Sequence, residues 1–523
     1  MNESRLLDAS ERDILQAAFE WTKSTILDIR FVPRKFHARG AIFEPQITEE
    51  QALISEVNIL ITSSQAFSNF EDSFAHEEAY SLNMSKDGQV LITASSLAGS
   101  LHSLQTFTQL FYSHTESLGG RYTPLAPVSI VDGPSFRHRG LNLDISRNWI
   151  PPSDVLRTID GMAINKMNRL HIHASDAQSW PLEVLDLPDL ALKGAYDPVQ
   201  IWSAQDLEQV QQYGRRRGVE VILEIDIPGH TTSIALAYPE LIAAANQEPW
   251  PTYAEEPPAG QLRLNSIQVQ AFLGTLFREL LPRNSLSSNL FHFGGDELNK
   301  NVYSVDPAVN SSTKVTLQPF VQTLMDQVFE LADEYNVTPI VWEEMLLEWN
   351  LELPKSTIIQ TWRSNEALTH VLREGHRVIF GANTHWYLDC GHGAFLDPVD
   401  PLQPGSDQRV QPPYLDYCGP YKNWRHIYSY NPLLGVPHNQ RHLILGGEVH
   451  MWGEMTDSVS LDGMLWPRAA AAAEVLWRGT GNPVSEDTTR RLAEMREHLV
   501  LRQIGAGVVQ MEWCLRNAGR CTI

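Results

Sequence analysis

Two adjacent carboxylates, Asp296 and Glu297, follow the glycine pair Gly294 and Gly295 at the end of a short apolar run. The glycines carry no Cβ and tolerate strained turns, so they let the backbone approach another group closely. An Asp in this position could simply cap a following helix beside a solvated Glu. The alternative is catalysis, because a positioned carboxylic acid can protonate the leaving group of a reaction. The choice depends on what else gathers at the same end of the fold.

The apolar run before these carboxylates is one of eight that alternate with amphipathic stretches from Gly140 onward. The link between the fifth and sixth runs is too short for a full helix, and the link between the seventh and eighth is loop-like. Eight strand-helix units predict a (β/α)8 TIM barrel. The runs are Leu141–Leu143, Leu170–Ala174, Val219–Ile225, Leu290–Phe293, Thr338–Trp342, Ile358–Thr361, Val378–Phe380 and Leu443–Leu445, and the clearest helical patterns are Ser153–Lys166, Ala204–Arg217, Val269–Leu281 and Leu317–Tyr335.

Residues before the first of these runs have a different pattern. A helix-like start is followed by two alternating runs, Val57–Thr62 and Gln89–Ala94, and then by a helical stretch, Leu97–Leu110. Asp132-Gly133-Pro134 has the composition of a boundary turn. We therefore expect a small α+β domain over residues 1–134 and the barrel with a C-terminal tail over residues 135–523.

Each predicted barrel strand is followed by polar or aromatic residues, and active sites of barrels lie at that end. A single Trp among them is more often a core residue than part of a site. Because all eight strands contribute, we predict a pocket. The residues are Asp144 and Arg147; His171, His173 and Asp176; Asp226 and His230; Asp296 and Glu297; Trp342 and Glu344; Trp362; Trp386, Tyr387 and Asp389; and Trp452 and Glu454.

These residue types suit a sugar ring, whose hydroxyls pair with Arg and carboxylates and whose apolar faces stack on Trp. Hydrolysis of a glycosidic bond needs a carboxylic acid that protonates the leaving oxygen. The usual second carboxylate can be replaced by a 2-acetamido group of the substrate itself. Adjacent residues such as Asp296 and Glu297 could not both reach the anomeric carbon as acid and nucleophile. This favours a division in which Glu297 protonates and Asp296 holds the acetamido nitrogen.

Composition excludes several classes of function. The chain has 523 residues, 43% of them hydrophobic, and a mean hydropathy of -0.24, values typical of a globular protein. It has no run of about 18 apolar residues that could span a membrane. A net charge of -23 argues against nucleic acid or an anionic membrane as partner. We expect a small-molecule or oligosaccharide substrate, no cofactor and no metal, and we leave a homodimer open as the oligomeric state.

The four cysteines form two sequence-close pairs, Cys390/Cys418 and Cys514/Cys521, without the spacing of a zinc site or a thioredoxin motif. We predict two disulfides, which require an oxidising compartment, with free buried thiols as the alternative for the first pair. The first residues contain no apolar signal sequence. We nevertheless expect a secreted or vacuolar, lysosome-like protein whose leader lies outside this sequence. Glycosylation triplets, which fit that route, begin at Asn2, Asn83, Asn310 and Asn336.

Several short stretches of the barrel, taken in chain order, resemble a known family. They are Arg139–Arg147, Asn165–Asn168, Gln178–Pro181, Lys193–Tyr196, Glu224–His230, Gly294–Glu297, Gly446–Glu448, Trp452–Glu454 and Trp466–Ala469. This order is similar to that of the β-N-acetylhexosaminidases of glycoside hydrolase family 20, and the cysteine pairs resemble those of secreted fungal members. The resemblance implies a retaining exo-glycosidase. It would remove terminal β-linked GlcNAc or GalNAc from chito-oligosaccharides or glycoconjugates through an oxazolinium intermediate.

The resemblance implies catalytic roles for three residues. Glu297 is the general acid and later the base that activates water. Asp296 orients the 2-acetamido group and stabilises the oxazolinium intermediate. Tyr387 donates a hydrogen bond to the acetamido carbonyl oxygen.

Eight further residues are assigned to substrate binding by the same resemblance. Three tryptophans wall the pocket for the acetamido methyl and the sugar face, and an Arg with two acids holds the hydroxyls. An Asp and a His position Glu297. In that order they are Trp342, Trp362 and Trp452; Arg147, Glu454 and Asp389; and Asp176 and His230.

Three positions depart from the family pattern. His171-Ile172-His173 stands where His-Trp-His is frequent, Ala177 follows Asp176 where a second Asp is frequent, and Asn148 follows the arginine where many members carry His. No catalytic group is lost. We expect these changes to affect the rim of the pocket and its preference for chain length.

Three alternatives stay open at this point. His171 and His173 could bind a metal, as in amidohydrolase barrels, but that class needs further ligands after the fifth and sixth strands, where no His occurs. A catalytically silent sugar-binding relative would have lost Glu297, Asp296 or Tyr387, and all three are present. A disaccharide-releasing lacto-N-biosidase or a narrow chitin-chain enzyme would differ in the space that loop 382–441 leaves beyond the first sugar.

Overall fold

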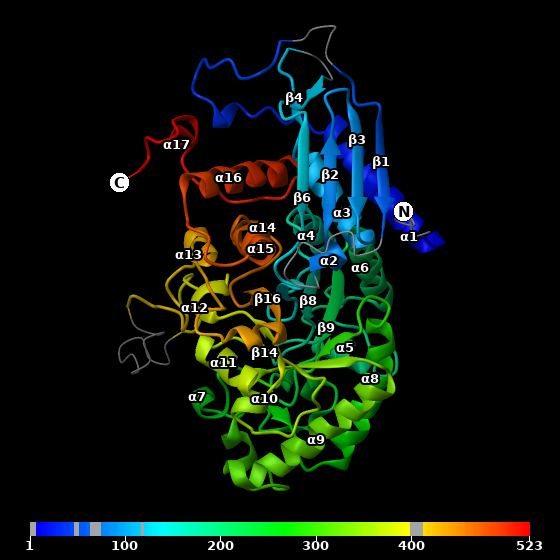
Figure 1. The fold of residues 1–523 in the computed structure, drawn as a ribbon. Coiled ribbons are helices and arrows are strands. Elements are labelled where there is room, and N and C mark those ends of the chain that lie inside the picture. Colours follow the sequence, from blue (N-terminus) through cyan, green and yellow to red (C-terminus); the bar gives the residue numbers. More distant parts are fainter. Residues whose placement is uncertain (1–6, 47–51, 63–74, 117–119, 398–411, 523) are drawn as a thin grey trace.

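The computed structural model describes residues 7–46, 52–62, 75–116, 120–397 and 412–522. A closed eight-stranded parallel barrel with surrounding helices forms the larger part, and a smaller α+β part lies beside it (Figure 1). The predicted fold class is therefore confirmed. Within the described ranges, no helix combines the length and the apolar character needed to cross a membrane.

In the smaller part, four strands form a sheet in the order β1-β3-β2-β6. They are β1 (Glu56–Ile61), β2 (Tyr80–Met84), β3 (Gln89–Ala94) and β6 (Val128–Asp132). The pair β1 and β3 is parallel, and the other pairs are antiparallel. Alternate residues of β3 are buried, as the period of two along a strand requires, and they form one core with helix α3 (Leu97–Thr108). Helix α1 (Ala9–Leu27) packs on α3.

All eight predicted runs are strands of the barrel. They are β7 (His138–Asp144), β8 (Arg169–His173), β9 (Glu220–Glu224), β12 (Leu290–His292), β13 (Thr338–Trp342), β14 (Ile358–Thr361), β15 (Arg377–Phe380) and β16 (Ile444–Met451). Pairing of β16 with β7 closes the barrel.

Two of these strands extend well beyond the apolar runs that predicted them. β16 continues through Glu448 and His450 to Met451, and β7 begins at His138. In both strands the added residues are buried, and Glu448 and His138 bond each other at 2.6 Å. The interior of the barrel is therefore polar in its middle, and a search for apolar runs misses strand residues that point there.

The predicted helices are present with bounds shifted by up to three residues. They are α4 (Pro152–Ile164), α6 (Ala204–Arg217), α8 (Ile267–Asn284) and α9 (Lys314–Glu334). Helix α6 shows the local reasons for its bounds: Ser203 and Asp206 form a capping box at its start, and Gly218 takes a left-handed conformation at its end. The link between β13 and β14 contains only the five-residue helix α10 (Glu343–Leu347), as predicted.

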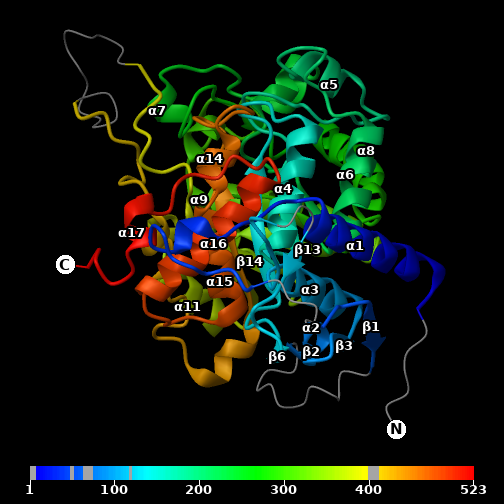
Figure 2. The same ribbon diagram turned by 90° about the horizontal axis from the view of Figure 1, so that it is seen from above.

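The remaining helices are shorter or follow the barrel. They are α2 (Ala75–Glu78), α5 (Asp189–Gly194), α7 (Trp250–Tyr253), α11 (Asn365–Arg373), α12 (Asn383–Trp386), α13 (Trp424–Tyr428), α14 (Leu461–Leu465), α15 (Arg468–Arg478), α16 (Glu486–Leu501) and α17 (Glu512–Arg516). Helices α15 and α16 pack together (Figure 2). Helix α16 also reaches the smaller part, because Glu494 accepts a hydrogen bond from the Tyr112 hydroxyl at 2.7 Å. Part of the predicted loop 382–441, residues 398–411, lies outside the described residues.

Arg139 of β7 joins the barrel to the smaller part. Its side chain is completely buried, and its guanidinium donates to Glu78 of α2 at 2.6 Å and to the Phe136 carbonyl at 2.9 Å. Glu78 also lies 2.7 Å from His102 of α3. Burial opposes ionisation of Glu78, but the charge of Arg139 outweighs it, and the pKa of Glu78 is strongly lowered. The buried guanidinium thus depends on this one carboxylate for its counter-charge.

We predict that Glu78→Ala lowers the free energy of unfolding by about 3–5 kcal/mol, because it leaves the buried Arg139 charge unpaired. Glu77→Ala is the matched control. The Glu77 side chain is 66% exposed, and its ion pair with the half-exposed Arg137 is long, at 3.7 Å. That control should change stability by less than about 0.5 kcal/mol. Urea unfolding followed by tryptophan fluorescence measures both. Equal losses for the two variants would contradict this account of the junction.

Candidate active site

The turn after β12 places the two adjacent carboxylates and needs both of its glycines. Gly294 and Gly295 have φ angles of 67° and 105°, in the region that favours glycine. A Cβ on Gly294 would lie 1.8 Å from Oδ1 of Asp226, and that same oxygen accepts a hydrogen bond from the Gly295 N–H at 2.7 Å. The carboxylate of Asp226 therefore occupies the space that the missing side chain leaves.

Glu297 and His230 face each other across the site, with Glu297 Oε2 3.5 Å from His230 Nε2. Both residues have a positive φ, 49° for Glu297 and 51° for His230, although neither is a glycine. Such backbone strain persists only where the surrounding structure enforces it, and it is concentrated at functional sites. Burial favours the neutral form of Glu297, but the hydrogen bond and charge of His230 outweigh burial and lower the pKa of Glu297.

His230 is held from behind by a carboxylate. Its Nδ1 lies 3.1 Å from Oδ1 of Asp176, which is fully buried. Burial disfavours a charged His230, yet the charges of Asp176 and Asp226 raise its pKa well above the usual value. The ring is thus an imidazolium that points at Glu297.

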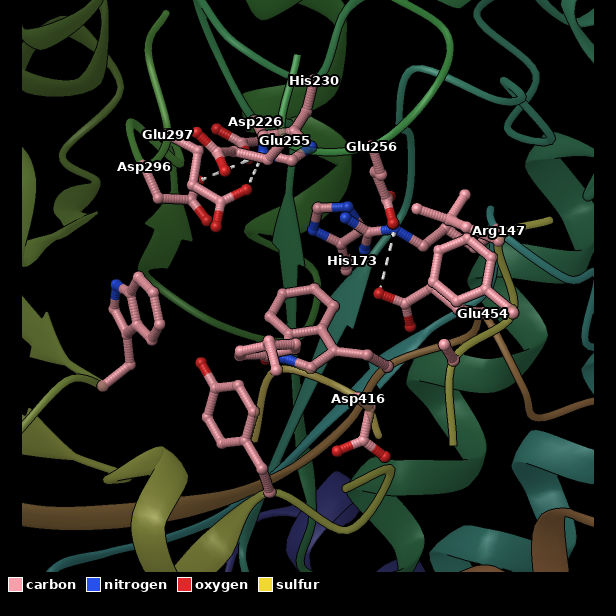
Figure 3. A pocket seen from close by; sticks show the side chains of 17 residues that line it. Arg147, His173, Asp226, His230, Glu255, Glu256, Asp296, Glu297, Asp416 and Glu454 are labelled. Atoms are coloured by element: carbon pink, nitrogen blue, oxygen red, sulfur yellow. Dashed lines mark hydrogen bonds and ion pairs between the residues drawn. The ribbon is translucent and has the colours of Figure 1, made fainter. Parts of the chain in front are cut away.

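On the opposite side of the cavity, Arg147 lies beside Glu256 and Glu454 (Figure 3), and two further carboxylates contact it from behind. Its side chain is 8% exposed. It lies 3.1 Å from Asp144, 3.1 Å from Asp176, 2.5 Å from Glu256 and 3.7 Å from Glu454. Asp176 has two further cations beside it, His173 and His230. Glu256 and Glu454 share Arg147 with Asp144 and Asp176, which favours their protonated forms.

Glu256 and Glu454, the two of these carboxylates that line the cavity, show this effect in their pKa values. Burial raises the pKa of Glu256, and the charge of Asp176 adds to the rise. Burial also raises the pKa of Glu454, with further contributions from Glu256 and Asp389. In both cases Arg147 opposes the rise without cancelling it. This wall can therefore both donate and accept hydrogen bonds, as sugar hydroxyls require.

Aromatic side chains form the third wall. The rings of Trp362 and Tyr387 stack with centroids 6.2 Å apart, and Tyr387 and Trp452 are 6.3 Å apart. Carboxylates fix the orientation of two tryptophans: Trp362 Nε1 donates to Glu344 at 3.0 Å, and Trp342 Nε1 donates to Glu224 at 2.8 Å. The wall is therefore a rigid apolar surface with few free polar atoms.

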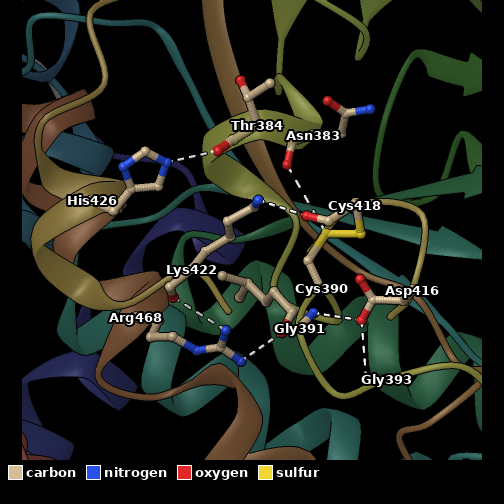
Figure 4. Close-up of a disulfide and its surroundings, with 11 residues drawn as sticks. Asn383, Thr384, Cys390, Gly391, Gly393, Asp416, Cys418, Lys422, His426 and Arg468 are labelled. Carbon is tan, nitrogen blue, oxygen red and sulfur yellow. Dashed lines mark hydrogen bonds between the residues drawn. A yellow bond between two sulfur atoms is a disulfide. The ribbon is translucent and has the colours of Figure 1, made fainter. Parts of the chain in front are cut away.

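A disulfide between Cys390 and Cys418 supports this wall (Figure 4). Both cysteines are buried and share a cluster with Tyr387 and Trp452. Asp416 strengthens the link, since its Oδ2 accepts from the Gly391 N–H at 2.6 Å. The second predicted disulfide, Cys514–Cys521, is also present, so both pairings are confirmed and the free-thiol alternative is wrong.

Comparisons with known proteins agree with this geometry. Residues 136–480 match the model of the glycosyl hydrolase family 20 catalytic domain. The chain belongs to glycoside hydrolase family 20. Residues 2–110 match a second model, described as beta-acetyl hexosaminidase like. A β-hexosaminidase of Arthroderma benhamiae is 47% identical, with 97% of this chain and 85% of that protein covered.

Solved structures of the family have the same fold. The family 20 β-N-acetylhexosaminidase of Streptomyces coelicolor A3(2) is 26% identical with a TM-score of 0.66, covering 82% of each chain. An exo β-N-acetylglucosaminidase of Vibrio harveyi has a TM-score of 0.73 at 22% identity, covering 95% of this chain and 74% of that one. The activity of this family 20 enzyme is that of a β-N-acetylhexosaminidase, the hydrolysis of a terminal β-linked N-acetylhexosamine.

The structure brings eight of the eleven predicted site residues of this family 20 enzyme to the cavity wall. They are Glu297, Asp296, Tyr387, Arg147, His230, Trp362, Trp452 and Glu454. Asp176 and Trp342 are buried behind the wall, where they contact His230 and Glu224. Asp389 also lies outside the lining, and burial raises its pKa to about 7.

Sequence reasoning missed a second group of lining residues. Glu256 has the shortest contact with Arg147, yet it belongs to a loop of Glu and Pro with no periodic pattern that could have identified it. The other missed residues come from loops as well and are Glu255, Ala394, Phe395, Leu396, Asp416 and Tyr417. Only the strand-end positions carried a usable pattern.

Within the described residues, four groups of three side chains bring donor atoms within 4.8 Å, as a metal ion would need. His171 in the first group points both ring nitrogens at carboxylates, 3.0 Å from Glu448 and 3.1 Å from Glu224. His230 in the group at the cavity does the same towards Asp176 and Glu297. Rings that donate from both nitrogens have no lone pair for a metal. These histidines therefore act as hydrogen-bond donors.

We predict that Gly294→Ala lowers kcat/KM on nitrophenyl β-GlcNAc by about 10²-fold or more, because its Cβ would displace Asp226 and with it the carboxylate turn. Gly375→Ala is the control: Gly375 has a similar φ of 81°, but a Cβ there would meet nothing within 4 Å. The control should lose about 1 kcal/mol of stability and keep its activity. Equal activity of the two variants would show that the turn does not depend on Asp226.

Proposed function

We propose that Glu297 is the acid and base of the reaction and that Asp296 and Tyr387 act on the acetamido group of the substrate. The observation that carries this proposal is the placement of Glu297, held by His230, across the cavity from Arg147. A sugar bound between them would have its hydroxyls at Arg147 and its anomeric carbon near Glu297. The neighbouring Asp296 would then lie on the side of the 2-acetamido group.

The proposed reaction has two steps. The acetamido carbonyl oxygen attacks the anomeric carbon while the bond to the leaving oxygen breaks, and Glu297 gives its proton to that oxygen. Asp296 stabilises the positive charge of the oxazolinium ring, and Tyr387 donates to the former carbonyl oxygen. Water then attacks the anomeric carbon, passes a proton to Glu297 and opens the ring. Two inversions at the same carbon give net retention.

Glu297 must hold a proton when substrate is bound. About 30% of its side chain is exposed at the cavity. A bound sugar covers this part and removes water, which disfavours the ionised form and raises the pKa. Substrate entry therefore acts against the effect of His230 and helps Glu297 to serve as the acid.

We further propose that the cavity takes one terminal sugar. Arg147, Glu454 and Glu256 would bind its hydroxyls, and Asp389, assigned to the same role, lies outside the lining of the cavity. Trp362 and Trp452 would contact its apolar surface, backed by Trp342. Because the wall opposite Glu297 is built from buried charged groups, a second sugar beyond it would have no room. This supports an exo-acting enzyme over a disaccharide-releasing one.

We also propose an oxidising, secreted or vacuolar location for this protein. Two disulfides support it, as do the exposed asparagines of three glycosylation triplets, Asn83, Asn310 and Asn336, whereas Asn2 lies outside the described residues. The division into domains 1–134 and 135–523 is retained as a proposal, and so is a homodimer.

We expect Glu297→Gln to lower kcat on chitobiose by about 10²-fold or more, since it keeps the shape of the side chain and removes the proton donor. The loss should be smaller on nitrophenyl β-GlcNAc, whose leaving group needs less protonation. Glu348→Gln, at an exposed glutamate outside the cavity, controls for the loss of one charge. Parent-like turnover of chitobiose by Glu297→Gln would refute the assignment.

We expect activity to require a substrate that carries its own nucleophile, the 2-acetamido group. A nitrophenyl β-glucoside, which lacks the acetamido group, should be inert even at saturation. A stable thiazoline mimic of the cyclised intermediate should inhibit more tightly than free GlcNAc. Asp296→Asn should lower kcat without abolishing binding. Mass spectrometry that traps a sugar on a protein carboxylate would overturn the mechanism.

A further inference from the structure

A line of alternating acidic and basic side chains runs through the interior of the barrel towards the cavity. Glu448 Oε2 lies 3.0 Å from His171 Nδ1, and His171 Nε2 lies 3.1 Å from Glu224 Oε2. Glu224 Oε2 lies 2.6 Å from His173 Nδ1, and His173 Nε2 lies 2.8 Å from Asp176 Oδ2. All five side chains are at most 1% exposed.

The geometry of this line determines its protonation. Both ring nitrogens of His171 face carboxylates, and so do both ring nitrogens of His173. A ring nitrogen that faces a carboxylate must donate, and only an imidazolium donates from both. The pKa values agree: burial lowers both, but the neighbouring carboxylates raise that of His171 to about 9 and that of His173 well above its usual value. The line therefore alternates in charge, with each cation between two anions.

The line does not end at Asp176. The same carboxylate contacts His230, 3.1 Å away, and His230 contacts Glu297. Glu224 is thus connected to Glu297 through three intervening side chains, His173, Asp176 and His230. Glu224 also accepts from Trp342 Nε1 through its other oxygen, so the same carboxylate holds the aromatic wall.

Other charged groups face both ends of this connection. Around Glu297 and His230 these are Arg147, Asp176, Asp226 and Asp296. Glu255, Glu256, Asp416, Tyr417 and Glu454 line the rest of the cavity. Around Glu224 they are His171, His173 and His292, with His292 Nδ1 at 3.0 Å, while Glu448 lies one step further along the line. Glu224→Gln leaves all of these groups in place, so their effects are common to the parent and this variant.

We propose that Glu224 is a positioning residue that sets the proton affinity of Glu297 through His173, Asp176 and His230. This inference rests on the acid and base role proposed for Glu297. The negative charge of Glu224 keeps His173 cationic, and the cation at His173 takes up part of the charge of Asp176. Because the anion at Glu224 offsets part of the positive charge of His173, Glu297 stands in less positive surroundings and keeps more of its affinity for a proton.

Loss of the charge at Glu224 lowers the pKa of Glu297 as long as His173 keeps its proton. The surroundings of Glu297 then become more positive, which favours the carboxylate form. The contact of His173 Nε2 with Asp176, 2.8 Å away, favours the cationic form of His173 in the variant. If His173 lost its proton instead, the cation nearer to Glu297 would disappear together with the anion farther away, and the pKa of Glu297 would rise.

The test is the pH dependence of kcat/KM on chitobiose for Glu224→Gln. The enzyme is active while Glu297 is protonated, so activity falls as pH rises through the pKa of Glu297 in the free enzyme. We expect the alkaline limb to move to lower pH by about half a unit. Glu448→Gln should move it in the same direction by less, and it carries the test if Glu224→Gln does not fold.

The matched control is Gln360→Met. Gln360 is fully buried and donates to Glu448 at 2.8 Å, so this change removes a neutral hydrogen bond from the line without removing a charge. It should lower stability and leave the alkaline limb at the position of the parent. If Glu224 had only a structural role, Glu224→Gln would lower activity by the same factor at every pH and would also leave the alkaline limb in place. A folded Glu224→Gln variant with an unshifted limb, or with a limb at higher pH, would overturn the inference.

Glu297→Gln separates this inference from the proposal on which it depends. Its residual rate should show no alkaline limb. If the limb persists in Glu297→Gln, the role of Glu297 is wrong and the inference falls with it. If the limb disappears in that variant but does not move in Glu224→Gln, only the role of Glu224 is wrong.

Discussion

A carboxylate inside a protein must be paired with a cation, because an isolated buried charge costs far more free energy than the whole fold provides. This requirement governs the centre of the molecule. Glu224 and Glu448 stand inside the barrel where most barrels place aliphatic side chains, and two histidines must be charged to balance them. The aliphatic layer of the barrel interior, Ile222, Ile340, Ile358 and Ile379, forms a separate small cluster. The polar layer and the active site are therefore one electrostatic unit.

The same requirement explains why the fold was easier to predict than the interior. The bounds predicted for β13, which is apolar after Thr338, are those that the structure shows, and the same holds for β14. β16 was predicted over three residues and spans eight, because the rest of it carries Glu448 and His450 into the polar layer. β8 and β9 were located in spite of their polar interior residues, because apolar residues alternate with them. In β16 the apolar run is instead interrupted by Gly446 and Gly447.

The residues of the candidate site also form two groups, one that could be predicted from the sequence and one that could not. Residues at strand ends, such as Asp296 and Arg147, were predictable because barrel topology brings strand ends together. Loop residues such as Glu256 and Tyr417 were not, since their positions depend on tertiary contacts that leave no periodic trace. The positive φ of Glu297 was also beyond prediction. It is a backbone conformation that only the folded chain reveals.

The disulfide Cys390–Cys418 lets the long connection before β16 both support the catalytic wall and form the mouth of the cavity, with different residues for each role. It joins two points within that connection beside Tyr387, whatever the length of the chain between the cysteines. Insertions or deletions inside the closed segment can then accumulate in descendants of this gene while the catalytic wall stays in place. The mouth of the cavity becomes a region in which new selectivities for the departing glycan can evolve, and the chemistry beneath it is inherited unchanged.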